Sequence, residues 1–171
     1  GVLIASRWQR SLGPLHLIED FRLPAQRFAF SFWPGLIRGG VIVCSVYMQD
    51  SIGMVDDNLI WLQQLEAVLL SAKVPFVVGG DFNACPLAVA ATGVPEKLRA
   101  RSVTSGGDTY TSGGHTSAID FFLVSESLLP FLASCTALES SPIAKHGPVV
   151  ITFRSPLAPM FITVARSPKN F

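Results

Sequence analysis

The stretch PFVVGGDFNACP, residues 75–86, decides the fold of this chain. Its apolar run, residues 76–78, has the composition of a strand that is buried on both faces. The two glycines that follow let the backbone turn sharply with nothing in the way. Asp81 and Asn83 are two residues apart, so their side chains point to the same side if the chain is still extended there. The stretch therefore predicts a buried strand that ends in a carboxylate and an amide.

A carboxylate and an amide at the end of a buried strand are suited to binding a cation, a water molecule or a phosphate group. Asp81 offers a ligand for a hard cation or an acceptor for a water molecule, and Asn83 can donate to a phosphate oxygen or hold that water. The alternative interpretation is an Asx turn that closes the strand without any catalytic role. This stretch by itself leaves both interpretations open.

Composition narrows the class of protein. A chain of 171 residues is long enough to bury a sizeable core and is expected to form one domain. Its hydrophobic content is 49%, with a mean hydropathy of +0.44, yet charged residues, Pro or Gly interrupt every apolar run. We therefore expect strands buried on both faces and no membrane span. The net charge of +1 excludes binding to nucleic acid by bulk electrostatics, so any contact with a polyanion must be local.

The cysteines and the N-terminus bear on the cellular setting. Three cysteines at wide spacing, with no CxxC motif, predict neither a disulfide framework nor a zinc-thiolate site, which favours a reducing intracellular compartment, the cytoplasm or the nucleus. The chain begins at Gly1 with an apolar, strand-like run over residues 2–5 and has no signal-peptide pattern. We expect an N-terminally truncated domain.

The first half of the chain reads as a hairpin followed by a helix. Residues 28–32 and 41–47 are β-type runs separated by Pro-Gly and Gly-Gly, which predicts an antiparallel pair. A helix is expected to begin at a cap, Asp56 or Asp57, and to carry a leucine stripe as far as Lys73, before Pro75. Hairpin, helix and central strand in that order suggest a layered α/β arrangement with helices outside the sheets.

Several other segments are interpreted as structural or surface elements without a functional role. A short strand is expected at residues 15–18, where His16 reads as a surface or packed histidine. Residues 86–101 are helical in composition but punctuated by Gly and Pro, and the basic KLRAR, residues 97–101, reads as a solvated helix end. The glycine-rich residues 102–116 lack the phosphate-loop motifs and read as a mobile surface loop. The sequence contains no GxSxG or HExxH, which disfavours a serine hydrolase or a zinc protease.

Two later stretches add polar groups at strand ends. SAIDFFLVS, residues 117–125, places Asp120 at the head of an apolar strand, and KHGPVVITF, residues 145–153, places His146 just ahead of another. With Asp81, these groups are expected to converge on one rim of a sheet pair. An aspartate bonded to a histidine would fix its tautomer and favour its charged form, which is suited to stabilise negative charge on phosphorus.

The ordered set of these motifs resembles the endonuclease/exonuclease/phosphatase superfamily, which includes DNase I-like nucleases, abasic-site and retrotransposon endonucleases and phosphoinositide phosphatases. The resemblance covers residues 1–153. The matching segments are VCSVYMQD at 43–50 with Tyr47, GDFN at 80–83, SAIDFFLVS at 117–125 and HGPV at 146–149. It implies an α/β (α+β) four-layer sandwich, two mainly antiparallel β-sheets face to face flanked by helices, here lacking the N-terminal strands. Residues 1–154 would form this domain and 155–171 a Pro-containing tail.

The resemblance also implies a metal, a reaction and roles for the residues. Mg²⁺ (or Mn²⁺) would be bound by Asp81, which would also orient or deprotonate the attacking water, while Asn83 would hold that water or a phosphate oxygen. His146 would bind the phosphoryl oxygens, Asp120 would orient His146, and Tyr47 would contact the phosphate, although Tyr47 taken alone reads as a half-buried aromatic. The implied reaction is in-line attack of water on a phosphate ester, with nucleic acid or another phosphate ester as substrate.

Two departures from the family pattern leave a second hypothesis open. The family carries an asparagine and the principal metal-ligating glutamate on N-terminal strands, which here would precede Gly1. Lys145 stands where the family has an aspartate before the histidine, and an ammonium group there would repel Mg²⁺ or pair with phosphate. The alternative to a metal-dependent phosphoesterase is therefore a catalytically inactive remnant, of retroelement type, with a structural or interaction role.

Overall fold

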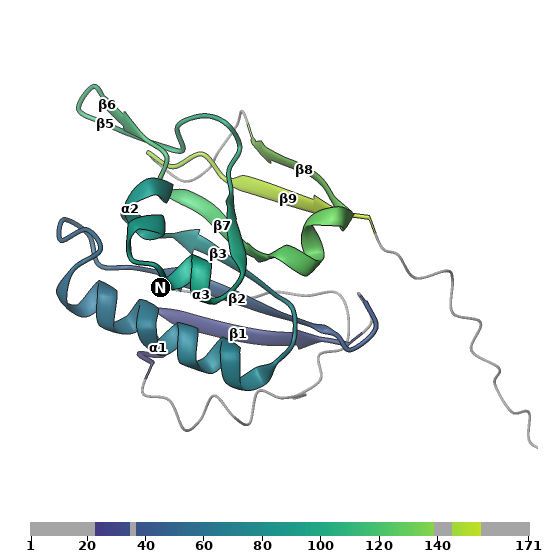
Figure 1. Ribbon diagram of the computed structural model, residues 1–171. Coiled ribbons are helices and arrows are strands. Elements are labelled where there is room, and N and C mark those ends of the chain that lie inside the picture. The colour runs from purple at the N-terminus through teal and green to yellow at the C-terminus, as the bar shows by residue number, and fades with distance from the viewer. Residues whose placement is uncertain (1–22, 35–36, 139–144, 155–171) are drawn as a thin grey trace, which may run out of the picture.

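A computed structural model describes residues 23–34, 37–138 and 145–154 of the chain. Its centre is a five-stranded sheet in the order β1-β2-β3-β7-β4 (Figure 1). The strands are β1 (Phe28–Trp33), β2 (Val41–Tyr47), β3 (Phe76–Asp81), β7 (Asp120–Ser125) and β4 (Ala100–Val103). The strands expected at residues 2–5 and 15–18, His16 and the tail at 155–171 lie outside the described residues.

The predicted hairpin and central strand are confirmed. β1 and β2 pair antiparallel from Phe28↔Val46 to Trp33↔Val41, β2 and β3 pair parallel, and β3 and β7 pair antiparallel. A parallel pair needs a crossover connection, and the helix between β2 and β3 supplies it. The ends of β2 and β3 and the start of β7 consequently meet at one edge of the sheet.

Helix α1 (Asp56–Ala72) forms this crossover. Its N-cap is Val55, without a side-chain cap hydrogen bond, so the predicted cap at Asp56 or Asp57 is wrong. Both aspartates lie in the first turn, where the helix dipole favours negative charge. The helix ends as expected, because Lys73 takes a left-handed conformation and Pro75 follows.

Two apolar cores lie on opposite faces of the five-stranded sheet. On one face, α1 packs with α2 (Pro86–Ala91) and α3 (Val94–Lys97) over side chains that include Ile42, Val78 and Leu123. On the other face, Val77 and Val124 pack with a 3-10 helix, η2 (Glu126–Phe131), and with strand β9 (Val149–Phe153), which pairs with β8 (Leu132–Ala137).

The two cores confirm that β3 is buried on both faces, because adjacent residues Val77 and Val78 enter opposite cores. The described residues therefore form three layers: helices, the five-stranded sheet and the β8–β9 sheet (Figure 1). This is the predicted α+β sandwich with sheets face to face, of which the described residues form three of the four expected layers.

The glycine-rich segment differs from its prediction. Part of residues 102–116 belongs to strands, and β5 (Tyr110–Ser112) pairs with β6 (His115–Ser117) around a two-residue turn. Gly113 and Gly114 both have positive φ, as a type I′ turn requires. The predicted surface loop is therefore wrong over residues 110–116, where the strands of a largely exposed hairpin carry polar side chains and lack the apolar alternation that marks a half-buried strand.

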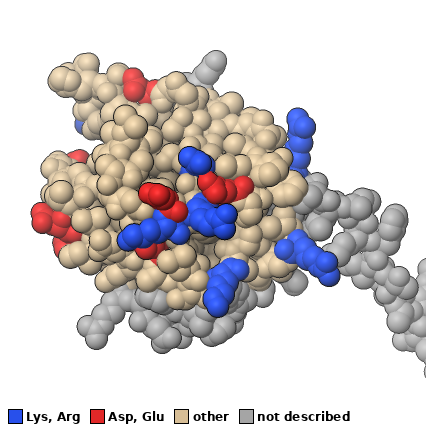
Figure 2. Space-filling view, in the orientation of Figure 1, with Lys and Arg blue, Asp and Glu red and all other residues tan. Residues whose placement is uncertain are grey.

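Two of the three basic residues of the segment KLRAR pair with neighbouring acids. Only Lys97 belongs to a helix, α3, and its ammonium group lies 3.6 Å from Glu66, while Arg101 in β4 pairs with Glu126 at 3.1 Å. Figure 2 shows basic and acidic side chains interspersed on this face rather than a continuous basic surface. Among the described residues, no helix is long and apolar enough to cross a membrane.

Candidate active site

Three of the predicted site residues are neighbours across the sheet. The parallel pairing of β2 with β3 places Tyr47 opposite Asp81, and the antiparallel pairing of β3 with β7 places Asp81 opposite Asp120. Residues paired in register present their side chains to the same face of a sheet. One edge of the sheet therefore carries a phenol and two carboxyl groups in a row.

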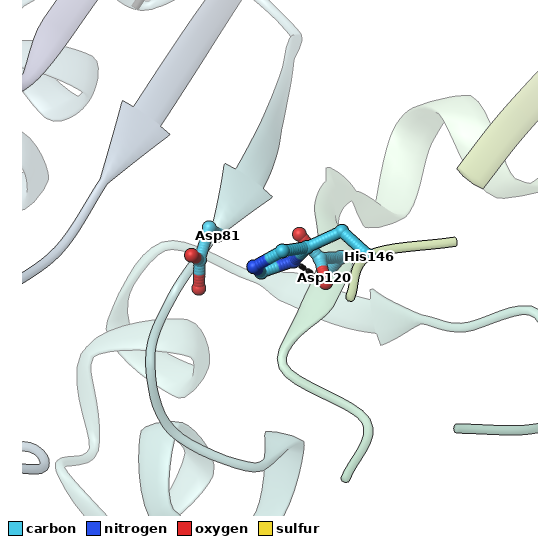
Figure 3. Close-up of side chains that lie close together, drawn as sticks. All are labelled: Asp81, Asp120 and His146. Atoms are coloured by element: carbon cyan, nitrogen blue, oxygen red, sulfur yellow. Dashed lines mark hydrogen bonds and ion pairs between the residues drawn. The ribbon is translucent and has the colours of Figure 1, made fainter. Parts of the chain in front are cut away.

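His146 joins this row from a distant segment of the chain. Its Nδ1 lies 3.0 Å from Oδ2 of Asp120, and both side chains are half-buried. In Figure 3 the imidazole extends toward Asp81, and a dashed line joins it to Asp120. Potential ligand atoms of Asp81, Asp120 and His146 all lie within 4.8 Å of one another. The structure thus brings Asp81, Asp120 and His146 together, with Tyr47 beside Asp81 in the sheet.

The β5 hairpin holds His146 and Asp120 in place. The backbone N–H of Gly147 donates to the carbonyl of Thr109 at 2.7 Å, and Thr111 N–H donates to the carbonyl of Lys145 at 2.8 Å. The buried hydroxyl of Thr109 accepts from the backbone N–H of Asp120 at 2.9 Å. The hairpin therefore fixes both members of the Asp120–His146 pair through backbone contacts.

The two glycines before Asp81 act differently from the prediction. Neither makes a sharp turn, because β3 continues through both of them to Asp81. A Cβ on Gly80 would lie 2.9 Å from the carbonyl carbon of Val46 in β2, and one on Gly79 would collide with the ring of Phe122. The glycines allow close approach of β2 and of an aromatic ring beside the site.

Asn83 lies beyond the end of the strand in a left-handed conformation, with φ 47°, so the assumption of an extended chain from Asp81 to Asn83 is wrong. Its backbone N–H donates to Oδ1 of Asp81 at 2.9 Å, which is an Asx turn. Its side-chain Nδ2 donates to the carbonyl of Met48 at 2.9 Å. The Asx turn and the carboxylate cluster therefore coexist, and the turn orients Asp81.

Electrostatics at the cluster favours a positive partner for Asp81. Burial raises the pKa of Asp81 above its ordinary value, and the nearby charges of Asp120 and Asp50 raise it further. The hydrogen bond from the Asn83 backbone and the proximity of His146 lower the pKa in part. A carboxylate in this setting gains stability from any cation that enters the cluster.

Two cavities open at this edge and share Tyr47, Asp81 and His146. One of about 340 Å³ is also lined by Asp120, and one of about 570 Å³ is also lined by Asn83, Asp50, Tyr110 and Lys145. A groove of about 730 Å³ lies at the opposite end of β3, beside Phe76, away from the carboxylates. The predicted site residues therefore line the two smaller cavities and not this groove.

Sequence reasoning missed several residues of this site. Asp50 follows Tyr47 by three residues and lines the larger cavity, and the ring of Tyr110 lies 4.8 Å from the ring of His146. Lys145, by contrast, was singled out from the sequence, and it precedes His146 with φ 71° and lines the same cavity. Tyr110 lies in the glycine-rich residues 102–116, which were interpreted as a mobile surface loop, so no signal in the sequence pointed to it.

The Asp81 and Asp120 carboxylates are the donors available to a metal here. Carboxylate oxygens are the ligands that Mg²⁺ and Mn²⁺ prefer, and Asp50 adds negative charge at the cavity wall. Nδ1 of His146 is engaged by Asp120, which leaves the carboxylate oxygens as the better donors. The donor set therefore fits a hard divalent cation.

This chain resembles known proteins in its structure and not detectably in its sequence. No protein-family model matches the sequence, and no curated protein matches it significantly. The endonuclease domain of TRAS1, a telomere-specific non-LTR retrotransposon, superimposes with a TM-score of 0.63 at 17% identity, over 80% of this chain and 67% of that one. The 3′-5′ exonuclease NExo from Neisseria meningitidis gives 0.56 at 16%, over 78% and 69%.

A third neighbour, an AP endonuclease from Archaeoglobus fulgidus, gives a TM-score of 0.55 at 17% identity, over 74% of this chain and 65% of that one. These neighbours share the DNase I-like fold, which is therefore the fold of this chain. The chain spans about two thirds of the length of each of them.

Proposed function

We propose that this chain is a metal-dependent phosphoesterase of nuclease type, which hydrolyses phosphodiester or phosphomonoester bonds by in-line attack of water. The observation that carries the proposal is the meeting of Asp81, Asp120 and His146 within 4.8 Å beside Tyr47. The neighbours named above are nucleases, and a related structure is a 3′ phosphatase bound to a product DNA hairpin. Nucleic acid is accordingly the first substrate to test.

Asp81 and Asp120 would hold the divalent cation, Mg²⁺ or Mn²⁺. Once bound, the cation would neutralise the negative charge that develops on the phosphoryl group. The proximity of the charges of Asp50 and Asp120 to Asp81 supports this assignment, because a cation relieves their mutual repulsion.

The remaining chemistry belongs to the side chains of this chain. Asp81 would orient the attacking water and accept its proton. Asp120 accepts from Nδ1 of His146, so Nε2 remains for the phosphoryl oxygens. Tyr47 would donate its hydroxyl to the phosphate, and Asn83 would hold the water or a phosphate oxygen while fixing Asp81 through the Asx turn.

The domain proposed for this activity spans residues 1–154, with 155–171 as a separate tail. Because the net charge is only +1, substrate contacts are expected to be local to the cavities rather than spread over a basic surface. Lys145, which lines the larger cavity, is the basic residue that would contact a phosphate group there.

Hydrolysis assays test this function directly. Supercoiled plasmid, a generic phosphodiester and a generic phosphomonoester are each incubated with the chain in Mg²⁺, in Mn²⁺ and in EDTA. We expect metal-dependent hydrolysis of at least one of them, lost in His146→Gln and retained in His115→Gln, a histidine on the exposed hairpin. Hydrolysis that persists in His146→Gln or in EDTA, or no hydrolysis by a folded protein, contradicts the proposal.

A further inference from the structure

Arg27 is bound to the end of strand β2, next to the proposed site. Its Nη1 donates to the carbonyl oxygens of Tyr47 and Met48, at 3.3 and 3.2 Å, and its own carbonyl accepts from the backbone N–H of Tyr47 at 2.9 Å. Carbonyl groups at the end of a strand need partners when they are only partly exposed to water. Arg27, which immediately precedes the neighbouring strand β1, supplies those partners.

The guanidinium group of Arg27 also lies against two aromatic rings. Its central carbon is 4.9 Å from the ring centroid of Tyr47 and 5.5 Å from that of Trp61, a residue of α1. Both distances are within the range of cation–π attraction, and a planar guanidinium can stack on rings in a way that an ammonium group cannot. Arg27 thus connects the phenol ring of Tyr47 to the helix layer.

The carbonyl of Met48 extends these contacts to the other site residues. It accepts from Arg27 and also from Nδ2 of Asn83, at 2.9 Å, while the backbone N–H of Met48 donates to the carbonyl of Asp81 at 2.9 Å. Met48 is fully buried, so this junction is rigid. A change at Arg27 is therefore transmitted both to Tyr47 and to the Asn83–Asp81 turn.

We infer that Arg27 is a positioning residue of the site: it sets the phenol of Tyr47 directly and the Asx turn of Asp81 through Met48. The inference rests on the proposed function. Arg27 is absent from the residues that line the two cavities, so it acts through Tyr47 rather than on the substrate. A purely structural role would instead lower stability without a specific effect on Tyr47.

Tyrosine NMR separates these two roles, because the chain has only two tyrosines, Tyr47 and Tyr110. With ¹³Cζ-labelled tyrosine, Arg27→Gln and Arg27→Lys are expected to shift the Tyr47 signal and leave that of Tyr110 in place. Arg38→Gln, which changes an exposed arginine in the segment between β1 and β2, is the control and should shift neither. A Tyr47 signal that is unchanged in both folded Arg27 variants overturns the inference.

Ligand binding gives a second readout that does not need turnover. Inorganic phosphate with Mg²⁺ is expected to shift the Tyr47 signal of the unsubstituted chain, with an affinity about tenfold weaker in Arg27→Gln. Equal phosphate affinity in Arg27→Gln contradicts a positioning role. A missing phosphate response in the unsubstituted chain counts against the proposed function, and the shift of Tyr47 in the variants then decides the role of Arg27.

A double-mutant cycle completes the test when hydrolysis is measurable. Arg27→Gln and Tyr47→Phe are each expected to lower kcat about tenfold, and the double variant should fall well short of a hundredfold loss, because part of the effect of Arg27 passes through Tyr47. A combined loss smaller than the product of the two single losses means that Arg27 acts in part through the Tyr47 hydroxyl. Independent effects, which would multiply to about a hundredfold, contradict that route.

Discussion

Alanine at Gly80 is expected to disrupt the sheet edge on which the site depends. The added Cβ would lie 2.9 Å from the carbonyl carbon of Val46 and closer still to its oxygen. These are backbone atoms of β2, so no side-chain rotation can relieve the collision. Gly80 also has φ +152°, a conformation that residues with a side chain rarely adopt.

The magnitude follows from these two effects. Backbone strain of this kind costs about 1–3 kcal/mol, and overpacking beside a second strand costs about 1–3 kcal/mol more. We therefore expect Gly80→Ala to lower the free energy of unfolding by about 4 kcal/mol. For a chain of this length each kcal/mol corresponds to about 3 °C, so Tm should fall by about 12 °C.

Gly79→Ala is the matched control. Its Cβ would meet the ring of Phe122, a half-buried side chain that can rotate, and Gly79 does not have a positive φ. Only the overpacking effect applies, so we expect a loss of about 1–2 kcal/mol and a fall in Tm of about 5 °C. Thermal and urea unfolding followed by circular dichroism measure both variants. A Gly80→Ala protein within about 2 °C of the unsubstituted chain, or more stable than Gly79→Ala, would refute this reasoning.

Four further predictions concern single side chains. Because burial raises the pKa of Asp81, its ionised form costs stability above the folded pKa; Asp81→Asn should therefore raise Tm at pH 7.5, with the gain disappearing as the pH falls toward about 4, the unfolded value. A lower Tm for Asp81→Asn at pH 7.5 contradicts this sign. Asp120→Asn should lower kcat about a hundredfold through loss of the ionic partner of His146, whereas Asp108→Asn, at an exposed site, should leave kcat unchanged in the same assay. Lys145→Asp should tighten Mg²⁺ binding and weaken inorganic phosphate binding, each by about threefold in calorimetric titrations, and opposite signs would exclude Lys145 as a phosphate contact. Asn58→Ala should lower the free energy of urea unfolding by about 2–3 kcal/mol, because the fully buried Asn58 amide bonds the backbone of Gln49 and Gly53; a loss below about 0.5 kcal/mol would contradict that role.

Local sequence patterns predicted much of the sheet. The continuous apolar run before Asp81 and the paired runs around the Pro-Gly and Gly-Gly dipeptides were sufficient to predict β1, β2 and β3. Polar groups at strand ends also indicated that Asp81, Asp120 and His146 converge, and these three side chains do lie together. Their catalytic roles stay predictions.

The parts that were missed depend on contacts between distant segments. Arg27 acts on Tyr47 across twenty residues, and Thr109 joins the segments of Asp120 and His146, so neither leaves a local pattern. The glycine pair was assigned a turn because glycine permits many conformations. The conformation that the pair adopts is instead determined by its packing against Val46 in β2 and against the ring of Phe122. Tertiary contacts rather than intrinsic propensity decided each of these cases.

Calorimetric titration with Mg²⁺ tests most directly the claim that this edge of the sheet is the metal centre of a phosphoesterase. The titration compares the unsubstituted chain with Asp81→Ala and with Asp108→Asn, which removes an exposed carboxylate outside the cluster. We predict saturable binding that is lost in Asp81→Ala and unchanged in Asp108→Asn. Equal binding by Asp81→Ala, or no binding by a chain whose unfolding transition shows that it is folded, would contradict the claim.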